Sequence, residues 1–309
     1  MKRPNFFIVG APKCGTSSLS EYLRSHPQVF FSFPKEPHYF AAELNPRFRR
    51  FDNEQQYLRE CFGRAGPKRH AVGEGSTLYL RSPVAARIIR QFDPDARIIA
   101  MFRNPADLAY SFHAQAVFNL DEDVTDFRAA WRLQDQRRRG QSIPKTCRTP
   151  EFLQYRDVAM LGEQLQRLYG VFGRNQVLTI LFEDFVADTA KVYAEVLAFL
   201  GLAHDGRSHF PPINENRRHR SGLIGRLMFT PPGWMYGGVQ WVKRRLGLKR
   251  TGVVDLLVRL NAARRQRPPL DADLRAEMIE TFRQDILTLQ DLLGRDLSHW
   301  LAQPAPAAV

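Results

Sequence analysis

Short apolar runs alternate with amphipathic segments along most of the chain. The runs have the length of buried strands and lie at residues 6–9, 29–31, 71–74, 98–102 and 176–182. Helical spacing of apolar residues follows at 19–23, 54–61, 82–91, 155–172, 190–200 and 271–300, with Ser82 and Asp271 as expected N-caps. This alternation predicts an α/β fold, in which a central, mainly parallel sheet is flanked by helices in three layers.

A loop of small residues joins the first predicted strand to the first predicted helix, over residues 10–18. The backbone N–H groups of a helix's first turn, the positive end of its dipole and the hydroxyls of Thr16, Ser17 and Ser18 are expected to point at one place. Lys13 adds a full positive charge there. The loop therefore predicts a site for a phosphate-like anion, and a glycine turn capped by Thr and Ser is the alternative.

The position of the lysine separates this loop from that of nucleotide triphosphatases. Their pattern is G-x-x-x-x-G-K-[ST], whereas here Thr16 follows Gly15 and Lys13 lies two residues before it. That position puts the ammonium beside the bridging oxygen of a bound phospho-ester. The motif PKCGTSSL resembles the 5′-phosphosulfate-binding loop of sulfotransferases whose donor is 3′-phosphoadenosine 5′-phosphosulfate (PAPS). The resemblance implies a P-loop-like fold and donor contacts from residues 13–18, namely Lys13, Cys14, Gly15, Thr16, Ser17 and Ser18.

The second apolar run leads into a proline-fenced loop, PKEPHYF at residues 34–40, expected at the carboxyl edge of the sheet. Glu36 is a candidate general base, since an attacking hydroxyl must lose its proton, and its aromatic neighbours are expected to raise its pKa. An exposed Lys35–Glu36 pair is the alternative. His38 has three open interpretations: a hydrogen-bond donor to the acceptor, another base, or a half-buried imidazole.

The segment KEPHYF also resembles the KEPHFF segment of heparan-sulfate-type and related bacterial sulfotransferases, in which the glutamate is the catalytic base. This resemblance implies the base role for Glu36 and participation of Lys35 and His38. Two positions depart from the glycan enzymes: Ala41 stands where they usually carry aspartate, and Gly75 where they carry lysine. The missing lysine removes a cation from the acceptor side, which weakens the expectation of a sulfated glycan acceptor.

A second anion motif is expected where the apolar run 98–102 ends. Arg103 stands at the predicted strand tip, Asn104-Pro105 supplies an N-cap and a first helical residue, and Ser111 lies about two turns into the helix. A guanidinium beside a hydroxyl suits a phosphate dianion, and the alternative is a charged loop residue followed by a serine bonded to its own backbone. The arrangement resembles the 3′-phosphate-binding element of the same family.

The later part of the chain carries further family patterns. FEDF at 182–185 implies scaffold residues, and GRDLSHWL at 294–301 resembles a carboxyl-terminal pattern of bacterial members. In the basic run 214–220, Arg220 or Arg218 is expected to reach the donor phosphates. We expect a single domain over residues 1–309, with a variable acceptor or cap region at about 112–160, whose centre holds Arg137-Arg138-Arg139.

An aromatic and basic segment lies at about 221–250. Core packing is its favoured interpretation, while peripheral contact with a membrane, an apolar acceptor site and dimer packing stay open.

Composition narrows the class of ligand. Across 309 residues, 45 Lys and Arg against 32 Asp and Glu leave a formal net charge of +13, which favours an anionic ligand: a nucleotide donor, an acidic acceptor, nucleic acid or anionic lipid. Three cysteines without C-x-x-C spacing predict neither a disulfide framework nor a zinc site. No apolar run approaches the ~20 residues of a membrane span, and the first run is too short for a signal peptide, so a cytoplasmic protein is expected.

Together these motifs predict a bacterial PAPS-dependent sulfotransferase. Glu36 would deprotonate an acceptor hydroxyl on a glycan, lipid or natural product, while Lys13 and the loop N–H groups stabilise charge during in-line transfer. No metal is expected, since no carboxylate stands beside the loop as a Mg²⁺ ligand would. No nucleic-acid partner is expected either. A P-loop kinase is disfavoured by the missing G-K-[ST], and a non-enzymatic polyanion binder would leave both anion motifs unexplained.

Overall fold

The computed structural model describes residues 2–44, 51, 53–211, 213, 217–219, 262–264 and 268–302. The chain forms two compact units: the first comprises Met1–Phe112, Gln154–Ile213 and Leu270–Val309, and the second His113–Leu153 and Asn214–Pro269. Arg220 and the segment 221–250 lie outside the described residues, and only the backbone of Arg218 is described.

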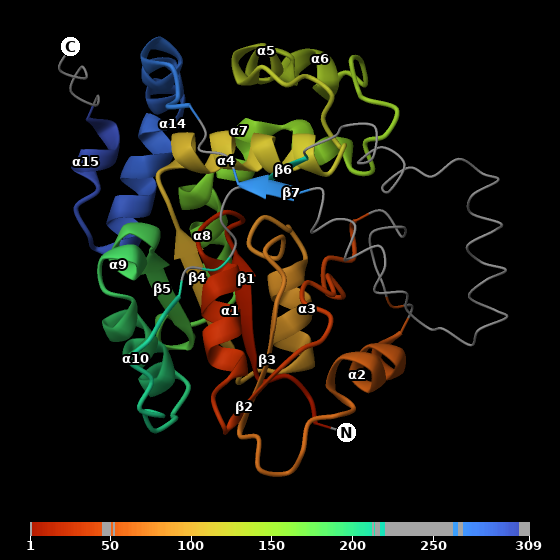
Figure 1. Cartoon of the computed structure of the whole chain (residues 1–309), viewed down its shortest axis with the longest axis vertical. Helices are drawn as coiled ribbons and strands as arrows, with labels where there is room; N and C mark the ends of the chain where they lie inside the picture. Colours follow the sequence, from red (N-terminus) through yellow and green to blue (C-terminus); the bar gives the residue numbers. More distant parts are fainter. Residues whose placement is uncertain are drawn as a thin grey trace, which may run out of the picture. The chain divides into compact units, whose positions relative to one another are not determined.

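A five-stranded sheet forms the centre of the first unit, and every pairing in it is parallel. Its strands are β1 (Phe6–Gly10), β2 (Val29–Phe31), β3 (Ala71–Gly75), β4 (Arg97–Phe102) and β5 (Val177–Leu181), in the order β2-β3-β1-β4-β5. All five coincide with the predicted apolar runs to within a residue or two, and the α/β prediction with a parallel sheet is confirmed (Figure 1).

Helices cover both faces of this sheet. The crossover from β1 to β2 and the crossover from β3 to β4 run in opposite directions along the sheet, so right-handed connections place their helices on opposite faces. Figure 1 shows α1 in front of β1. The helices of the first unit are α1 (Thr16–Arg24), α2 (Glu54–Phe62), α3 (Ala85–Phe92), α7 (Tyr155–Ala159), α8 (Leu161–Tyr169), α9 (Phe182–Ala187), α10 (Thr189–Phe199), α14 (Ala272–Leu293) and α15 (Ser298–Leu301), with a 3₁₀ turn, η2 (Arg174–Gln176).

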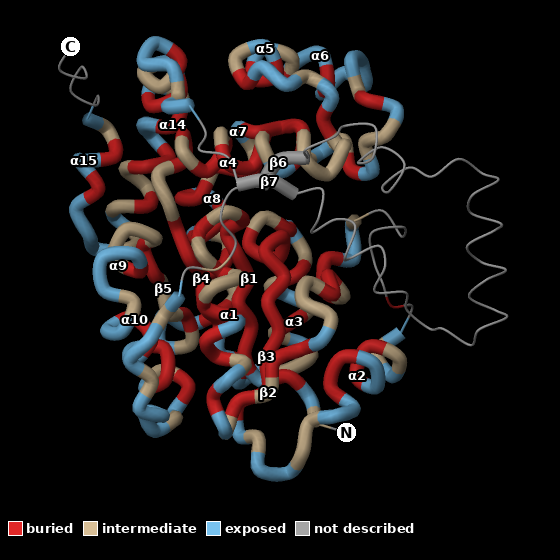
Figure 2. The backbone as a smooth tube through the Cα atoms, in the orientation of Figure 1, coloured by how far each residue is buried: buried red, intermediate tan, exposed pale blue. Residues whose placement is uncertain are grey.

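The core of the first unit is the sheet itself. Nearly all residues of β1, β3 and β4 are buried, as the red strands of Figure 2 show. Strands buried on both faces read as continuous apolar runs, which is why these strands were visible in the sequence. Glu74 in β3 is an exception to this apolar pattern, because it places a carboxyl group with no exposed surface inside the sheet.

Three predicted helices are shorter or broken. The helix predicted at 82–91 begins at Ala85, whose N–H donates to Ser82 Oγ at 2.9 Å. The predicted helix 155–172 is divided at Met160, because the carboxylate of Asp285 in α14 accepts hydrogen bonds of 2.9 Å from the N–H groups of Gly162 and Glu163 at the start of α8. The predicted helix 271–300 begins as expected, with Asp271 accepting from Leu274 N at 3.0 Å. It ends at Leu293, since Gly294 adopts a left-handed conformation with φ of 62°.

The second unit contains α5 (Phe127–Arg132), α6 (Gln134–Arg138), η1 (Pro150–Leu153), β6 (Arg217–His219) and β7 (Ala262–Arg264), and the boundary between the units falls within α4 (Pro105–Phe118). Arg137 makes two hydrogen bonds to Glu122, of 2.6 and 2.7 Å, and neither side chain is exposed. Arg137 is therefore part of a buried ion pair and does not belong to an exposed basic surface with Arg138 and Arg139.

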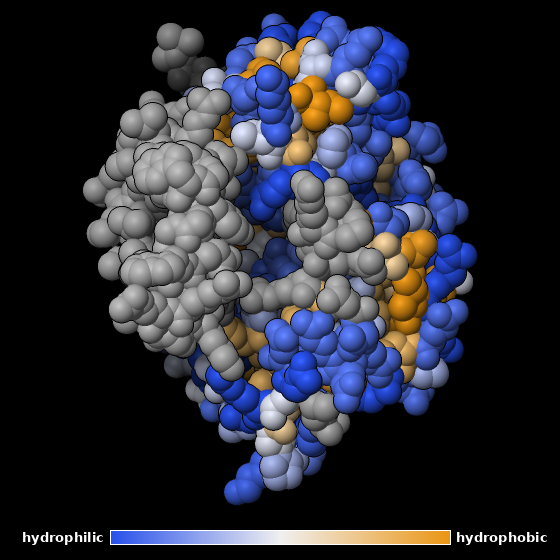
Figure 3. All heavy atoms as spheres, turned by 90° about the vertical axis from the view of Figure 1, so that its right-hand side faces the viewer, coloured by the Kyte–Doolittle hydropathy of each residue, from blue (hydrophilic) through white to orange (hydrophobic). Residues whose placement is uncertain are grey.

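No helix among the described residues is both long and apolar enough to cross a membrane. On the face drawn in Figure 3, hydrophilic side chains cover most of the described surface, with smaller hydrophobic patches between them.

Candidate active site

The loop between β1 and α1 turns sharply at two glycines. Gly10 has φ of 137°, and a Cβ atom there would lie 2.5 Å from the carbonyl oxygen of Thr77. Gly15 has φ of 87°, and a Cβ atom there would lie 3.1 to 3.2 Å from the rings of Phe185 and Phe182. Only glycine fits both backbone angles and both close approaches without strain. The loop is therefore a fixed path that ends where α1 begins.

The start of α1 is arranged to attract an anion. It has no acidic residue in its first turn, and no side chain in the described part of the chain caps it. The first-turn N–H groups of a helix lack helical partners, and the dipole adds positive charge. Lys13, in the loop just before, has φ of 64°. The loop backbone and its lysine thus supply positive charge at one end of the sheet.

The loop side chains are placed differently from one another. Ser17 Oγ accepts a hydrogen bond of 3.0 Å from Lys35 Nζ, and Ser18 Oγ donates to the carbonyl of Ile213 at 3.2 Å. Thr16 is buried. Cys14 is fully buried, its Sγ donates to the carbonyl of Pro12 at 3.4 Å, and burial raises its pKa to about 12. Any ligand contact of Cys14 would therefore come from its backbone.

Arg103 meets this loop, although 90 residues separate it from Lys13. β4 pairs with β1, so the residue that follows β4 emerges beside the loop that follows β1. Arg103 Nη1 donates to the carbonyl of Lys13 at 3.3 Å, and the guanidinium lies 4.7 Å from the ring centre of Phe182. Asn104 caps α4 as predicted, accepting from Ala106 N at 3.0 Å. The two predicted anion motifs therefore share one sheet edge.

Ser111, the hydroxyl predicted to help Arg103, lies two turns into α4 and is buried.

The proline-fenced loop is tied to the loop at residues 10–18 by a hydrogen bond from Lys35, which also forms an ion pair with Glu36. Lys35 Nζ lies 2.9 Å from Glu36 Oε1 and 3.0 Å from Ser17 Oγ, and His38 Nε2 lies 3.8 Å from Glu36 Oε2. Glu36 and His38 both have positive φ, of 59° and 52°. Residues other than glycine are strained at such backbone angles. They adopt these angles only where the surrounding structure holds the backbone in place. Lys35 thus contacts both the candidate base, Glu36, and Ser17 in the loop at residues 10–18.

The charged groups around Glu36 lower its pKa, contrary to the expectation from the sequence. Burial acts to raise its pKa, but the ammonium of Lys35 first, then His38 and Lys13, outweigh it, so the pKa lies below the ordinary 4.5. The expected rise is wrong, because the nearest group is a cation and not an aromatic ring. Burial and Lys35 also lower the pKa of His38 below 6.5, although Glu36 opposes them. At neutral pH, Glu36 is a carboxylate and His38 a neutral imidazole.

A buried acid that the sequence reasoning did not use lies beneath this loop. Tyr57 in α2 donates to Glu74 Oε2 at 2.8 Å, and burial raises the pKa of Glu74 to about 7. Its neighbours in the chain hold the loop, since Ser76 Oγ accepts from His38 N and Tyr79 Oη accepts from Phe40 N, both at 3.1 Å. The available signal was a glutamate inside a buried strand.

Within the described ranges, no group of three or more His, Cys, Asp or Glu side chains is arranged to hold a metal ion. The charged groups that converge are Lys13, Arg103, Lys35 and Glu36. With the start of α1, they form a site suited to an anion with charge at two ends and to proton transfer beside it.

The chain matches known proteins over much of its length. The model of the family described as "Sulfotransferase family" matches residues 4–206. The chain is similar to carbohydrate sulfotransferase 15 of Homo sapiens, with 25% identity over 64% of this chain and 44% of that protein. It is also similar to bifunctional heparan sulfate N-deacetylase/N-sulfotransferase 2 of Bos taurus, with 24% identity over 98% of this chain and 30% of that protein. The chain thus spans less than half the length of these relatives.

Among solved structures, a sulfotransferase from Alicyclobacillus acidocaldarius superposes with a TM-score of 0.72 and 28% identity, covering 98% of this chain and 100% of the other. The alignment with that structure extends over nearly the whole chain.

Proposed function

Because the chain belongs to the sulfotransferase family, we propose that it moves the sulfuryl group of PAPS to an acceptor hydroxyl. The observation that carries this proposal is the hydrogen bond of 3.3 Å from Arg103 Nη1 to the carbonyl of Lys13. It brings two anion motifs to one sheet edge, and PAPS carries phosphosulfate at one end and phosphate at the other. A ligand with a single charged end would leave one of the two motifs unused.

In this proposal the donor is held mainly by the first unit. Lys13 and the N–H groups of residues 14–18 bind the 5′-phosphosulfate, where the dipole of α1 favours negative charge. Arg103 and Ser111 bind the 3′-phosphate, for which a guanidinium is suited by its planar fork of donors. Arg220, which lies outside the described residues, is proposed to reach the phosphates as well.

Glu36 acts as the general base. The acceptor oxygen attacks sulfur, its proton passes to the carboxylate of Glu36, and the bond from sulfur to the bridging oxygen breaks, releasing adenosine 3′,5′-bisphosphate. Lys13 stabilises the charge that develops on the leaving oxygen. Lys35, 2.9 Å from Glu36, keeps the base ionised before the acceptor binds, and His38 is placed to assist it. No step in this scheme requires a metal ion.

The acceptor is proposed to be a hydroxyl of a glycan, a lipid or a natural product. Both relatives are glycan enzymes by name, a carbohydrate sulfotransferase and a heparan sulfate N-deacetylase/N-sulfotransferase, which supports a sugar acceptor among these choices. Gly75 in place of lysine leaves one cation fewer near the loop at residues 34–40 that carries Glu36. This favours an acceptor with less negative charge than a sulfated chain.

Titration calorimetry tests the donor site without knowledge of the acceptor. We expect adenosine 3′,5′-bisphosphate to bind and ATP–Mg²⁺ to bind at least tenfold more weakly, and we expect Arg103→Met to weaken the bisphosphate by about tenfold or more. Preference for ATP–Mg²⁺ would indicate a kinase. Binding that ignores the nucleotide and falls steeply with salt would indicate a general polyanion binder. Labelled donor incubated with extracts of the host would then identify the acceptor.

A further inference from the structure

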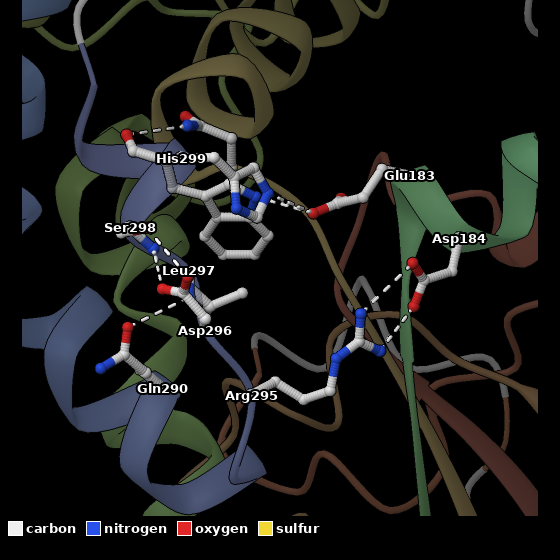
Figure 4. A network of polar contacts seen from close by, with 10 residues as sticks. Glu183, Asp184, Gln290, Arg295, Asp296, Leu297, Ser298 and His299 are labelled. Carbon is white, nitrogen blue, oxygen red and sulfur yellow. Dashed lines mark hydrogen bonds and ion pairs between the residues drawn. The ribbon is translucent and has the colours of Figure 1, made fainter.

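The acidic residues of α9 are bound by a segment more than a hundred residues further along the chain. We call residues 295–300, between α14 and the middle of α15, the C-terminal clamp. Glu183 Oε1 accepts from Trp300 Nε1 at 2.8 Å and lies 3.1 Å from His299 Nε2. Asp184 accepts from Arg295 at 2.7 and 3.4 Å. Figure 4 shows Arg295 facing Asp184, and His299 facing Glu183.

These contacts lead directly to the proposed donor site. Phe182, the residue before Glu183, lies under the guanidinium of Arg103 and against the loop at Gly15. On the other side, Asn104 Nδ2 donates to the carbonyl of Trp300 at 3.3 Å. Trp300 therefore contacts Glu183, which follows Phe182 in the sequence, and Asn104, which follows Arg103.

The two halves of the clamp differ in burial. Trp300 is 3% exposed and the side chain of its acceptor Glu183 is 39% exposed, whereas the side chains of Arg295 and Asp184 are 53% and 40% exposed. Exposed ion pairs contribute little, because water and salt screen them, while a hydrogen bond from a buried donor is better shielded from water. The exposed pair thus offers a matched control at the same interface.

We propose that Trp300 is a positioning residue for the donor. It holds Phe182 through Glu183 and holds Asn104 directly, so that Arg103 is oriented toward the terminal phosphate. This inference rests on the proposed function. It assigns to the segment GRDLSHWL a role in ligand binding beyond that of a carboxyl-terminal pattern. Because Arg103 serves the end of the donor far from sulfur, the clamp acts on donor affinity and leaves the transfer step unchanged.

The experiment compares two nucleotides that differ only in the phosphate that Arg103 is proposed to bind. Calorimetry measures adenosine 3′,5′-bisphosphate and adenosine 5′-phosphate on wild type, Trp300→Phe and Arg295→Met. Trp300→Phe keeps a buried ring but removes the N–H donor to Glu183. We expect it to weaken the bisphosphate about five- to tenfold and the monophosphate less than twofold. Arg295→Met should change both less than twofold.

Asn104→Ser provides a second route that does not disturb the buried tryptophan. Serine retains the helix cap but loses the amide that donates to Trp300, so the same selective loss of bisphosphate affinity is expected. Steady-state rates should show a raised KM for PAPS with kcat within about twofold of wild type.

Equal weakening of both nucleotides, no weakening in Trp300→Phe or Asn104→Ser, or an equal loss in Arg295→Met would overturn the positioning role. A wild-type protein that binds neither nucleotide would instead overturn the proposed function, so the two failures are distinguishable.

Discussion

The phosphate loop, residues 10–18, and the base loop, residues 34–40, meet at Lys35 but are built on different principles. The phosphate loop depends on its backbone path, with Gly10 and Gly15 at angles and contacts that only glycine accepts. The base loop depends on ionisable side chains whose charges set one another's pKa values. The comparison teaches that the proposed donor binding would follow from chain geometry, whereas the proposed proton transfer would follow from a balance of charges that substitutions can shift.

Removal of the loop lysine should have the largest effect. Lys13→Ala is expected to lower turnover by about two to three orders of magnitude, because it removes the cation proposed to stabilise the leaving oxygen. It should also weaken adenosine 3′,5′-bisphosphate, since the lysine serves the donor in both states. Turnover and calorimetry together measure this. A loss of turnover with full affinity would mean that Lys13 acts only in the transition state.

The base loop should respond differently to loss of its carboxylate. Glu36→Gln is expected to lower turnover by about two to three orders of magnitude while the affinity for the bisphosphate stays close to that of wild type. The contrast between the two variants is the sharpest test of the comparison. A rate within a few-fold of wild type for Glu36→Gln would remove Glu36 from the base role.

Lys35 should set the pH range rather than the maximal rate. Its ammonium holds the pKa of Glu36 below 4.5, so Lys35→Met is expected to raise that pKa and move the acidic limb of the rate profile to higher pH. Lys35→Arg retains the charge and serves as the control, with little displacement of the limb expected. The measurement is kcat/KM against pH. An acidic limb that stays in place in Lys35→Met would show that other groups set the charge of Glu36.

The last effect concerns stability rather than activity and comes from Glu74. Its folded pKa of about 7 lies above the ordinary 4.5, so the folded state binds the extra proton and stability falls as pH rises through this window. Between pH 5 and 8, the wild type should lose on the order of 3 kcal/mol of unfolding free energy relative to Glu74→Gln. Urea unfolding at both pH values measures this. Parallel changes in the two proteins would contradict it.

Much of the first unit was predictable because its strands are buried on both faces. Mainly apolar runs marked all five strands, although Glu74 interrupts β3 and Thr179 interrupts β5. Parallel strands bring their carboxyl ends to one edge, which is why Lys13 and Arg103 could be expected to meet. The caps at Asn104 and Asp271 were likewise readable, since their roles depend on local residues alone.

What the sequence did not reveal depends on side chains that meet across long distances or in a particular rotamer. Lys35 turns back onto Glu36 and reverses the expected pKa shift. Arg137, which appeared to belong to an exposed basic run, is buried against Glu122, 15 residues away. The bond between Trp300 and Glu183 joins residues 117 positions apart, and no local pattern predicts it.

The burial of Cys14 has a practical consequence. A thiol in the middle of an anion-binding loop would be an obvious target for oxidants and alkylating agents, which react with the thiolate. With its pKa raised to about 12 and no exposed surface, this sulfur stays protonated and shielded. Electrophilic inhibitors directed at this thiol should therefore fail, and mild oxidants should leave it unmodified.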